Sequence, residues 1–336
     1  MFYRIITGEK ALTAFVILVL AIINWLPAIF FHDSTTMYHS VDQMPLYQLI
    51  LVIFNGQYLS TQFFAFLLLL ILGILLVRIN AKFILIQQRT FLPAFFLILL
   101  SGYLPENLKL SCTLIASLFL VFTLNTLLSS YKADPNSLSF FIAGLLLGVG
   151  SLFYAPLIYF LLFVWISLAI LRNFYWREYI FPILGLLIPY AFYFAWMVIY
   201  DVKILEFLDV FKESLSGGFP ALNFDLPHKI FGGYLILIIL ISSIYMMKVF
   251  KFRKIYLRNY FLVLFWLFFI SIAVFALLSG FNTGMIYIIL IPISYLLTNY
   301  FCTGRKSWEN KTLLYLMILG EIFLVINREV EWTFSF

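Results

Sequence analysis

Two polar stretches interrupt an otherwise apolar chain, and the first of them holds the residue types best suited to catalysis. Residues 32–43 combine acids, hydroxyls and histidines, among them His32, Asp33 and Asp42. A carboxylate beside a membrane can act as a general base or hold a divalent cation, and an imidazole can share either task. Asp33 and Asp42 are therefore the candidate catalytic residues, with His32 as a weaker candidate.

The second polar stretch, residues 201–229, carries five acidic residues together with His228 and Lys229. His228 becomes a further weak catalytic candidate if the two stretches meet in space. The alternative is simple solvation, since polar residues gather wherever a chain leaves a membrane. The chain has no phosphate-binding loop, dinucleotide-binding glycine pattern, HExxH, CxxC or GxSxG motif to decide between these interpretations. We predict no defined metal site, although the carboxylates are compatible with a divalent cation.

Glu321 is a candidate of a different kind, because it lies inside the last apolar segment, about two turns before Arg328. A carboxylate at membrane depth is costly, so it usually faces the interior of a bundle or a polar cavity. We expect Glu321 to lie within hydrogen-bond reach of a polar side chain or a bound lipid head group. Lys229 and Arg328 complete this candidate lipid or buried polar site. A protonated glutamate with a purely structural role is the alternative.

The composition indicates which kind of fold must position these residues. Of the 336 residues, 64% are hydrophobic, 20% aromatic and only 11% charged, and the mean hydropathy is +1.06. Soluble globular proteins contain roughly 45–50% apolar and about 25% charged residues, so this chain cannot cover a water-facing surface. Its apolar runs do not alternate with polar residues, which favours helices. We predict an all-α, polytopic transmembrane bundle that forms a single integral membrane domain over residues 1–336.

Eleven apolar segments are predicted to span the membrane, because a helix needs about 20 apolar residues to cross a bilayer core. Two shorter apolar stretches, at 45–54 and around 205–211, are predicted to be helices in the outer membrane interface. Gly144 and Gly148 form a GxxxG pattern, which predicts close packing between two helices. The predicted spans are 11–31, 61–78, 84–103, 110–129, 138–154, 156–172, 179–200, 230–248, 258–279, 282–301 and 312–327.

The distribution of basic residues predicts the orientation of the chain. Eleven spans with a cytoplasmic N-terminus put sixteen of the 21 Lys and Arg residues on the cytoplasmic side, including a basic loop at 248–258. This agrees with the positive-inside rule. The C-terminus and the two polar loops, 32–60 and 201–229, then face outward. The net charge of +6 belongs to cytoplasmic loops that face anionic lipid, and no nucleic-acid partner is expected.

The layout resembles that of the type C membrane glycosyltransferases. The resemblance rests on a first span with a cytoplasmic N-terminus, an acid at its outer exit, an interfacial helix at 45–54 and a second large outer loop. In that family the acid of the first outer loop is the catalytic base or a metal ligand, so the resemblance implies this role for Asp33 or Asp42. It also implies a polyprenyl-phosphate-linked sugar as substrate. The chain departs from the family in lacking a paired Asp-Glu or DxD in that loop and a large soluble domain after the spans, so a degenerate, non-catalytic relative of the family is the alternative.

The chain also resembles an uncharacterised family of multi-pass inner-membrane proteins from Bacteroidota. The stretches that carry this resemblance are RTFLP at 89–93, GVGSLFYAP at 148–156 and WRE at 176–178. It implies a location in the bacterial inner membrane and no particular activity. Two functions are therefore expected as alternatives, namely an enzyme-like protein with an outward-facing site for a lipid-linked substrate and a non-catalytic subunit of a cell-envelope complex. A transporter is less favoured, because charged residues inside the spans are few.

Overall fold

The computed structural model describes residues 11–30, 44–54, 57–86, 88–103, 108–131, 138–172, 176–215, 225–250, 254–277, 283–303 and 308–330. Over these residues the protein is all-α, as predicted, with thirteen α-helices and two short 3-10 helices. The α-helices are α2 (Ala11–Phe30), α3 (Pro45–Ile53), α4 (Tyr58–Phe83), α5 (Leu92–Ser101), α6 (Cys112–Ser129), α7 (Leu138–Ser151), α8 (Leu161–Leu171), α9 (Trp176–Ile199), α10 (Ile204–Leu215), α11 (Leu226–Phe250), α12 (Ile255–Leu277), α13 (Ile286–Thr303) and α14 (Trp308–Val330). The 3-10 helices are η3 (Ala155–Phe160) and η4 (Thr283–Met285).

Six of the described helices, α4, α6, α9, α11, α12 and α13, are long and apolar enough to cross a membrane by length and composition. Each of the other five segments predicted as spans also contains a described helix, namely α2, α5, α7, α8 and α14. Large apolar side chains face outward from these helices, such as Phe192 at 75% exposure and Leu277 at 78%. Such a surface is suited to contact with lipid chains rather than with water.

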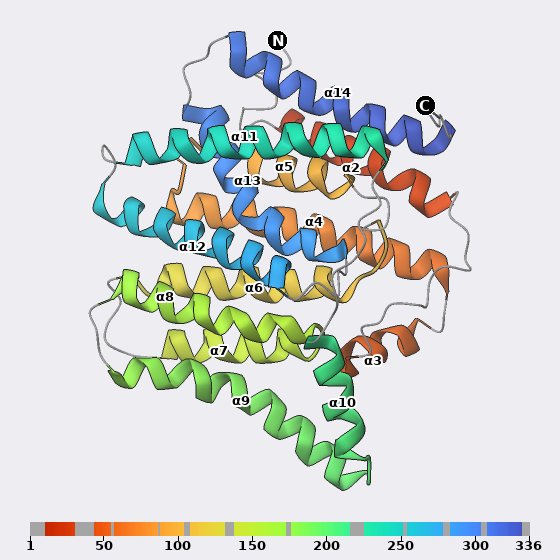
Figure 1. The fold of residues 1–336 in the computed structure, drawn as a ribbon, viewed down its shortest axis with the longest axis vertical. Helices are drawn as coiled ribbons and strands as arrows, with labels where there is room; N and C mark the ends of the chain where they lie inside the picture. The colour runs from red at the N-terminus through yellow and green to blue at the C-terminus, as the bar shows by residue number, and fades with distance from the viewer. Residues whose placement is uncertain are drawn as a thin grey trace.

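The long helices lie side by side in a stack, and successive ones run in opposite directions (Figure 1). The C-terminal ends of α4, α6 and α8 meet at one end of this stack. There Lys82 Nζ donates to Ser129 Oγ over 2.9 Å, and Arg172 Nε donates to the Ser130 carbonyl over 3.2 Å. The N-terminal end of α12 joins them, because Asn259 donates to a carbonyl of α8. We call this the basic end of the stack, since the basic residues of α4, α9 and α12 gather there.

The third predicted span, 84–103, is shorter than expected. α4 ends where Ile84 takes a left-handed backbone conformation, with a φ of 50°, and the chain becomes helical again only at Leu92. α5 is therefore a ten-residue helix, about 15 Å long, which is half the thickness of a bilayer core. All ten residues are buried, against α2, α4, α13 and α14. The non-helical backbone between α4 and α5 carries the exposed side chains of Gln88 and Arg89.

The fifth and sixth predicted spans, 138–154 and 156–172, are separate helices. α7 ends at Ser151, and the next segment begins as the 3-10 helix η3 before it continues as α8. Pro156 lies in the first turn of η3, where its missing N–H costs no internal hydrogen bond.

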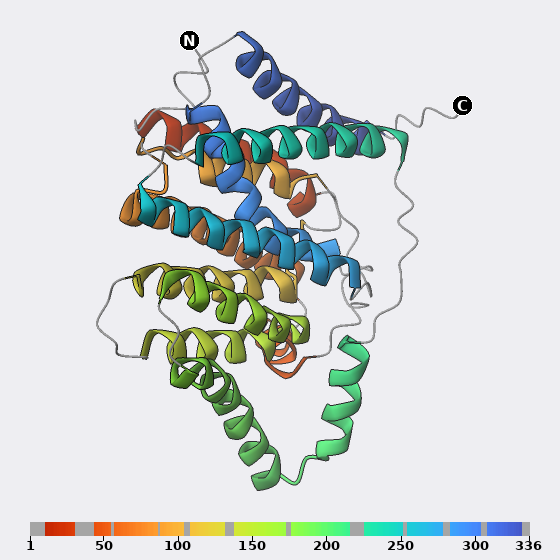
Figure 2. The same ribbon diagram turned by 60° about the vertical axis from the view of Figure 1, so that its left-hand side comes forward.

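α7 and α9 pack backbone against backbone at their glycines, as the GxxxG pattern predicts. A Cβ atom added at Gly144 of α7 would overlap the carbonyl oxygen of Pro182, and one added at Gly185 of α9 would overlap the carbonyl oxygen of Phe141. Beyond this contact α9 turns away from the stack (Figure 2). α9 contains Pro189, which cannot donate a backbone hydrogen bond and so favours a bend in the helix.

The two short helices predicted in the outward-facing loops are both present, as α3 and α10. α10 folds back on the second half of α9 through aromatic contacts. The Phe207 ring lies 5.0 Å from that of Tyr193 and 5.7 Å from that of Phe194, measured between centroids. Together these two segments form a V-shaped projection beside the stack (Figure 2).

Candidate functional site

Glu321 is buried in a polar cluster away from the basic end of the stack. Its side chain, on α14, is 1% exposed and faces the interior of the bundle, as the sequence predicts. A Cβ atom added at Gly102, just after α5, would lie 2.5 Å from Glu321 Oε1 and 3.1 Å from Asn24 Nδ2 of α2. The carboxylate and the amide therefore share the space that the absent side chain of Gly102 leaves open.

Asn24 brings a hydrogen-bond donor to Glu321. Its side chain is 5% exposed, and its Nδ2 has no hydrogen-bond partner within the described residues. A buried donor without a partner costs roughly 1–3 kcal/mol. Native proteins keep few such groups. The Asn24 Nδ2 donor therefore suggests that a hydrogen-bond acceptor from outside the described residues binds here.

Tyr103 connects this region to α11. Its hydroxyl donates to the backbone carbonyl of His228 over 2.9 Å, and the centroids of the two rings lie 6.0 Å apart. Tyr103 follows Gly102, the residue that faces the Glu321 carboxyl group. The structure thus brings His228, a weak candidate from the sequence, to the neighbourhood of Glu321. We call Glu321, Asn24, Tyr103 and His228 the polar cluster.

An apolar groove lies between α11 and α14, directly beside the polar cluster. It encloses about 510 Å³, and its lining includes Ile230 and Phe231 of α11 and Leu316 and Gly320 of α14. The Phe231 ring packs on Gly320 and lies 5.9 Å from the Tyr103 ring, so it is near both the groove and the polar cluster. We call this the α11–α14 groove. Its size and lining suit a hydrocarbon chain.

The main catalytic candidates Asp33 and Asp42, and the weaker candidate His32, lie outside the described residues. Lys229 is exposed on α11 next to His228, so it belongs to the surface above the polar cluster rather than to its buried part. Arg328 is on α14, but its side chain is outside what the structure describes. Within the described residues, no three His, Cys, Asp or Glu side chains come together to hold a metal ion.

Sequence reasoning missed Asn24, Gly102 and Tyr103 as neighbours of Glu321. Asn24 could have been found, because it is the one amide in the predicted span 11–31 and an amide at membrane depth needs a partner. No pattern in the sequence connects Gly102 or Tyr103 with Glu321, since these residues meet only through the packing of α5 on α14.

A buried ion pair at the basic end was also missed. Arg172 Nη1 lies 3.2 Å from Glu178 Oε1, and the two side chains are 8% and 6% exposed. The Arg172 guanidinium also lies over the Phe140 ring of α7, 5.5 Å from its centroid. This pair joins the end of α8 to the first turn of α9, whereas the sequence predicts only that Arg172 lies on the cytoplasmic side.

The described helices and their exposed apolar side chains define a multi-pass helical membrane protein. The chain belongs to DUF6427, a family of unknown function, whose family model matches residues 40–331. The expectation of an uncharacterised family is confirmed to that extent. No curated protein and no solved structure matches the chain, so the resemblance to type C glycosyltransferases finds no support in these comparisons.

Proposed function

We propose that this protein binds a lipid-like molecule at the outward-facing end of the bundle. The apolar part of the ligand would lie in the α11–α14 groove, and its polar head would reach the polar cluster. The observation that carries the proposal is the position of the buried Glu321 next to Gly320, which lines the groove. Within one turn of α14, Glu321 thus faces the bundle interior and Gly320 faces a groove wide enough for a hydrocarbon chain.

The chemistry of the polar cluster favours a head group that both donates and accepts hydrogen bonds. The Glu321 oxygens are acceptors when ionised, whereas Asn24 Nδ2 is a donor. Sugar hydroxyls satisfy both kinds of group. Lys229, exposed beside His228, offers a cation for a phosphate nearer the water.

We infer a polyprenyl-phosphate-linked sugar as the ligand that best fits these groups. Transfer of its sugar would need a base, and the resemblance to type C glycosyltransferases assigns that role to Asp33 or Asp42. The protein would then be a glycosyltransferase-like enzyme of the bacterial inner membrane. A divalent cation held by these carboxylates would be consistent with that chemistry.

We propose that all eleven predicted segments cross the membrane, the third as α5 together with the non-helical residues before it, and that the basic end faces the cytoplasm. A reporter active only in the cytoplasm should therefore be active when fused after Tyr131, Arg253 or Gly304 and inactive when fused after Gly218. The reason is the preference of basic residues for the cytoplasmic side. Alkaline phosphatase, which is active outside, should give the opposite pattern. An external position for Arg253 would contradict the eleven-span topology.

Filling the α11–α14 groove should remove a bound lipid. Leu316, which is 54% exposed, lines the groove, whereas Leu319, which is 61% exposed on the same helix, does not. Native mass spectrometry of protein purified from bacterial membranes in mild detergent should show lipid on the wild type and on Leu319→Trp. Leu316→Trp should retain about tenfold less, which corresponds to about 1.4 kcal/mol of lost binding.

Two further variants in the same assay separate head-group recognition from catalysis. Glu321→Gln keeps the size of the side chain and removes its charge, so it should change which lipids are retained. An Asp33→Asn, Asp42→Asn double variant should retain the lipid and lose sugar transfer, because loss of a general base typically costs about 10²–10⁴-fold in rate. Equal retention of one lipid by wild type, Leu316→Trp and Glu321→Gln would contradict the proposal.

A second candidate function is that of a non-catalytic subunit in a cell-envelope complex. The V-shaped projection of α9 and α10 favours it, because this projection carries the exposed side chains of Tyr200 at 65% and Leu205 at 74% outside the stack. In the mass spectrometry experiment, a stoichiometric partner protein in place of a lipid would favour this function.

A further inference from the structure

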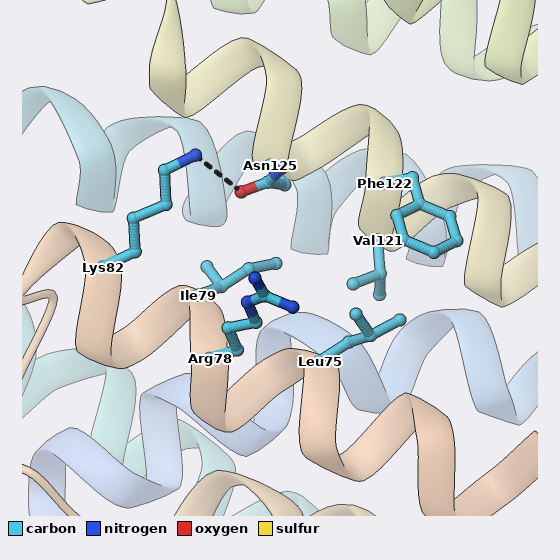
Figure 3. Close-up of a pocket in the computed structure, with 7 residues that line it drawn as sticks. All are labelled: Leu75, Arg78, Ile79, Lys82, Val121, Phe122 and Asn125. Atoms are coloured by element: carbon cyan, nitrogen blue, oxygen red, sulfur yellow. Dashed lines mark hydrogen bonds between the residues drawn. The ribbon is translucent and has the colours of Figure 1, made fainter.

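A second pocket lies between α4 and α6 at the basic end, and it shares no lining residue with the α11–α14 groove. It encloses about 350 Å³. Figure 3 shows the residues that line it. Arg78 and Lys82 line it from successive turns of α4, and Asn125 faces them from α6. Leu75 and Phe122 line it one turn deeper in the stack. The pocket is therefore polar toward the helix ends and apolar toward the middle of the bundle.

The polar part of this pocket presents hydrogen-bond donors. Lys82 Nζ donates to Asn125 Oδ1 over 3.3 Å and to Ser129 Oγ over 2.9 Å. Because the Asn125 oxygen accepts from Lys82, its Nδ2 hydrogens are left to donate elsewhere. Arg78 forms no ion pair within the described residues, and none of the seven described lining residues is acidic. Like charges one turn apart on a helix repel each other, so an anion between them would be stabilising.

We propose that this pocket binds the phosphate of an anionic membrane phospholipid. The phosphate oxygens would accept hydrogen bonds from the Arg78 guanidinium, the Lys82 ammonium and the Asn125 amide. An acyl chain of the same lipid would lie along Leu75 and Phe122. Anionic head groups are abundant at the cytoplasmic surface of membranes, which is the side that we infer for the basic end.

The absence of an acid among the described lining residues also predicts the choice of head group. Phosphatidylethanolamine carries an ammonium group that needs an acceptor, and the described part of the pocket offers it no carboxylate. The glycerol head group of phosphatidylglycerol carries no ammonium group and needs no carboxylate. This lipid also keeps a net negative charge, which is complementary to Arg78 and Lys82. The pocket should therefore prefer phosphatidylglycerol.

Native mass spectrometry of the full-length protein can test this site. The protein is titrated in detergent micelles with phosphatidylglycerol, phosphatidylethanolamine or inorganic phosphate, and the bound molecules are counted. We expect phosphatidylglycerol to bind at least about fivefold more tightly than phosphatidylethanolamine. Arg78→Gln and Lys82→Gln should each weaken its binding about fivefold, and the double variant about 25-fold, as the typical contribution of a basic residue to anionic lipid binding implies.

Matched variants distinguish a specific site from an effect of net charge. An Arg177→Gln, Lys311→Gln double variant removes the same two charge types outside the pocket and should bind phosphatidylglycerol as the wild type does. Leu75→Trp keeps both cations but fills the pocket, so it should lose the lipid. Equal losses in the two double variants would overturn the proposal, as would wild-type binding by the Arg78, Lys82 double variant. Inorganic phosphate binding as tightly as the lipid would overturn it too, because it would indicate a free-phosphate site.

Discussion

Gly144→Ala should lower the melting temperature of the purified protein by several degrees, although it adds a single carbon atom. The new Cβ would overlap the Pro182 carbonyl, which belongs to the backbone of α9 and cannot rotate away as a side chain can. α7 and α9 would have to move apart along their shared contact. Overpacking of this kind typically costs about 1–3 kcal/mol, and each 1 kcal/mol lowers the melting temperature by roughly 2–4 °C in a domain of moderate size.

Gly233→Ala is the matched control for this prediction. Gly233 also lies inside a helix, α11, but a Cβ atom there would meet nothing within 4 Å. Alanine is favoured over glycine in a helix by roughly 0.5–1 kcal/mol, so this variant should be as stable as the wild type or slightly more stable. The melting temperatures of Gly144→Ala and Gly233→Ala can be measured by thermal unfolding followed by gel filtration in the same detergent. If the two variants have the same melting temperature, α7 and α9 are not in backbone contact.

Glu178→Gln should destabilise the protein by about 3–5 kcal/mol, because it leaves the Arg172 guanidinium buried without an opposite charge. The substitution keeps the size of the side chain, so the effect reports charge rather than packing. The Arg172 side chain cannot easily turn toward water, because its Nε donates a hydrogen bond to the Ser130 carbonyl and its guanidinium lies over the Phe140 ring. The loss should appear as a lower melting temperature and a lower yield of folded protein.

The exposed ion pair between Lys203 and Glu206 provides the control. Its atoms are separated by 3.1 Å, almost the same distance as in the buried pair, but its side chains are 79% and 68% exposed. Exposed pairs contribute roughly 0–1 kcal/mol, so Glu206→Gln should leave stability nearly unchanged. An Arg172→Leu, Glu178→Leu double variant should recover much of the stability that Glu178→Gln loses. Equal melting temperatures for Glu178→Gln and Glu206→Gln would rule out the buried pair as a stabilising contact.

The apolar pattern predicted the presence of the helices well, because the length and hydropathy of a segment are local properties. Each predicted span contains a described helix, and the short helices at 45–54 and around 205–211 are both present. The short length of the helix within 84–103 has a tertiary cause. A helix with all its residues buried in protein needs no twenty-residue apolar run, and the sequence does not show that α13 and α14 would cover α5.

The candidate site was predictable only in part. The burial of Glu321 follows from the cost of a carboxylate in lipid, which is a property of one residue and its segment. The neighbours of Glu321 come from α2 and from the end of α5, and no local pattern selects Gly102 or the adjacent Tyr103 among the residues of those segments. The like-charged Arg78 and Lys82 were predicted only to lie on the cytoplasmic side, among the sixteen basic residues counted there, whereas their shared pocket depends on the position of α6.

The burial of α5 also determines when the bundle can be completed during synthesis. α2 and α4 leave the ribosome before α5, but α13, which covers another side of α5, is made only after the seven described α-helices α6 to α12. The Tyr295 hydroxyl of α13 then donates to the Leu76 carbonyl of α4 over 2.8 Å, which joins the newest part of the chain to one of the oldest. Until that moment α5 has an uncovered side. A nascent chain that stalls before α13 would therefore expose a half-length apolar helix to the proteases that remove unfinished membrane proteins.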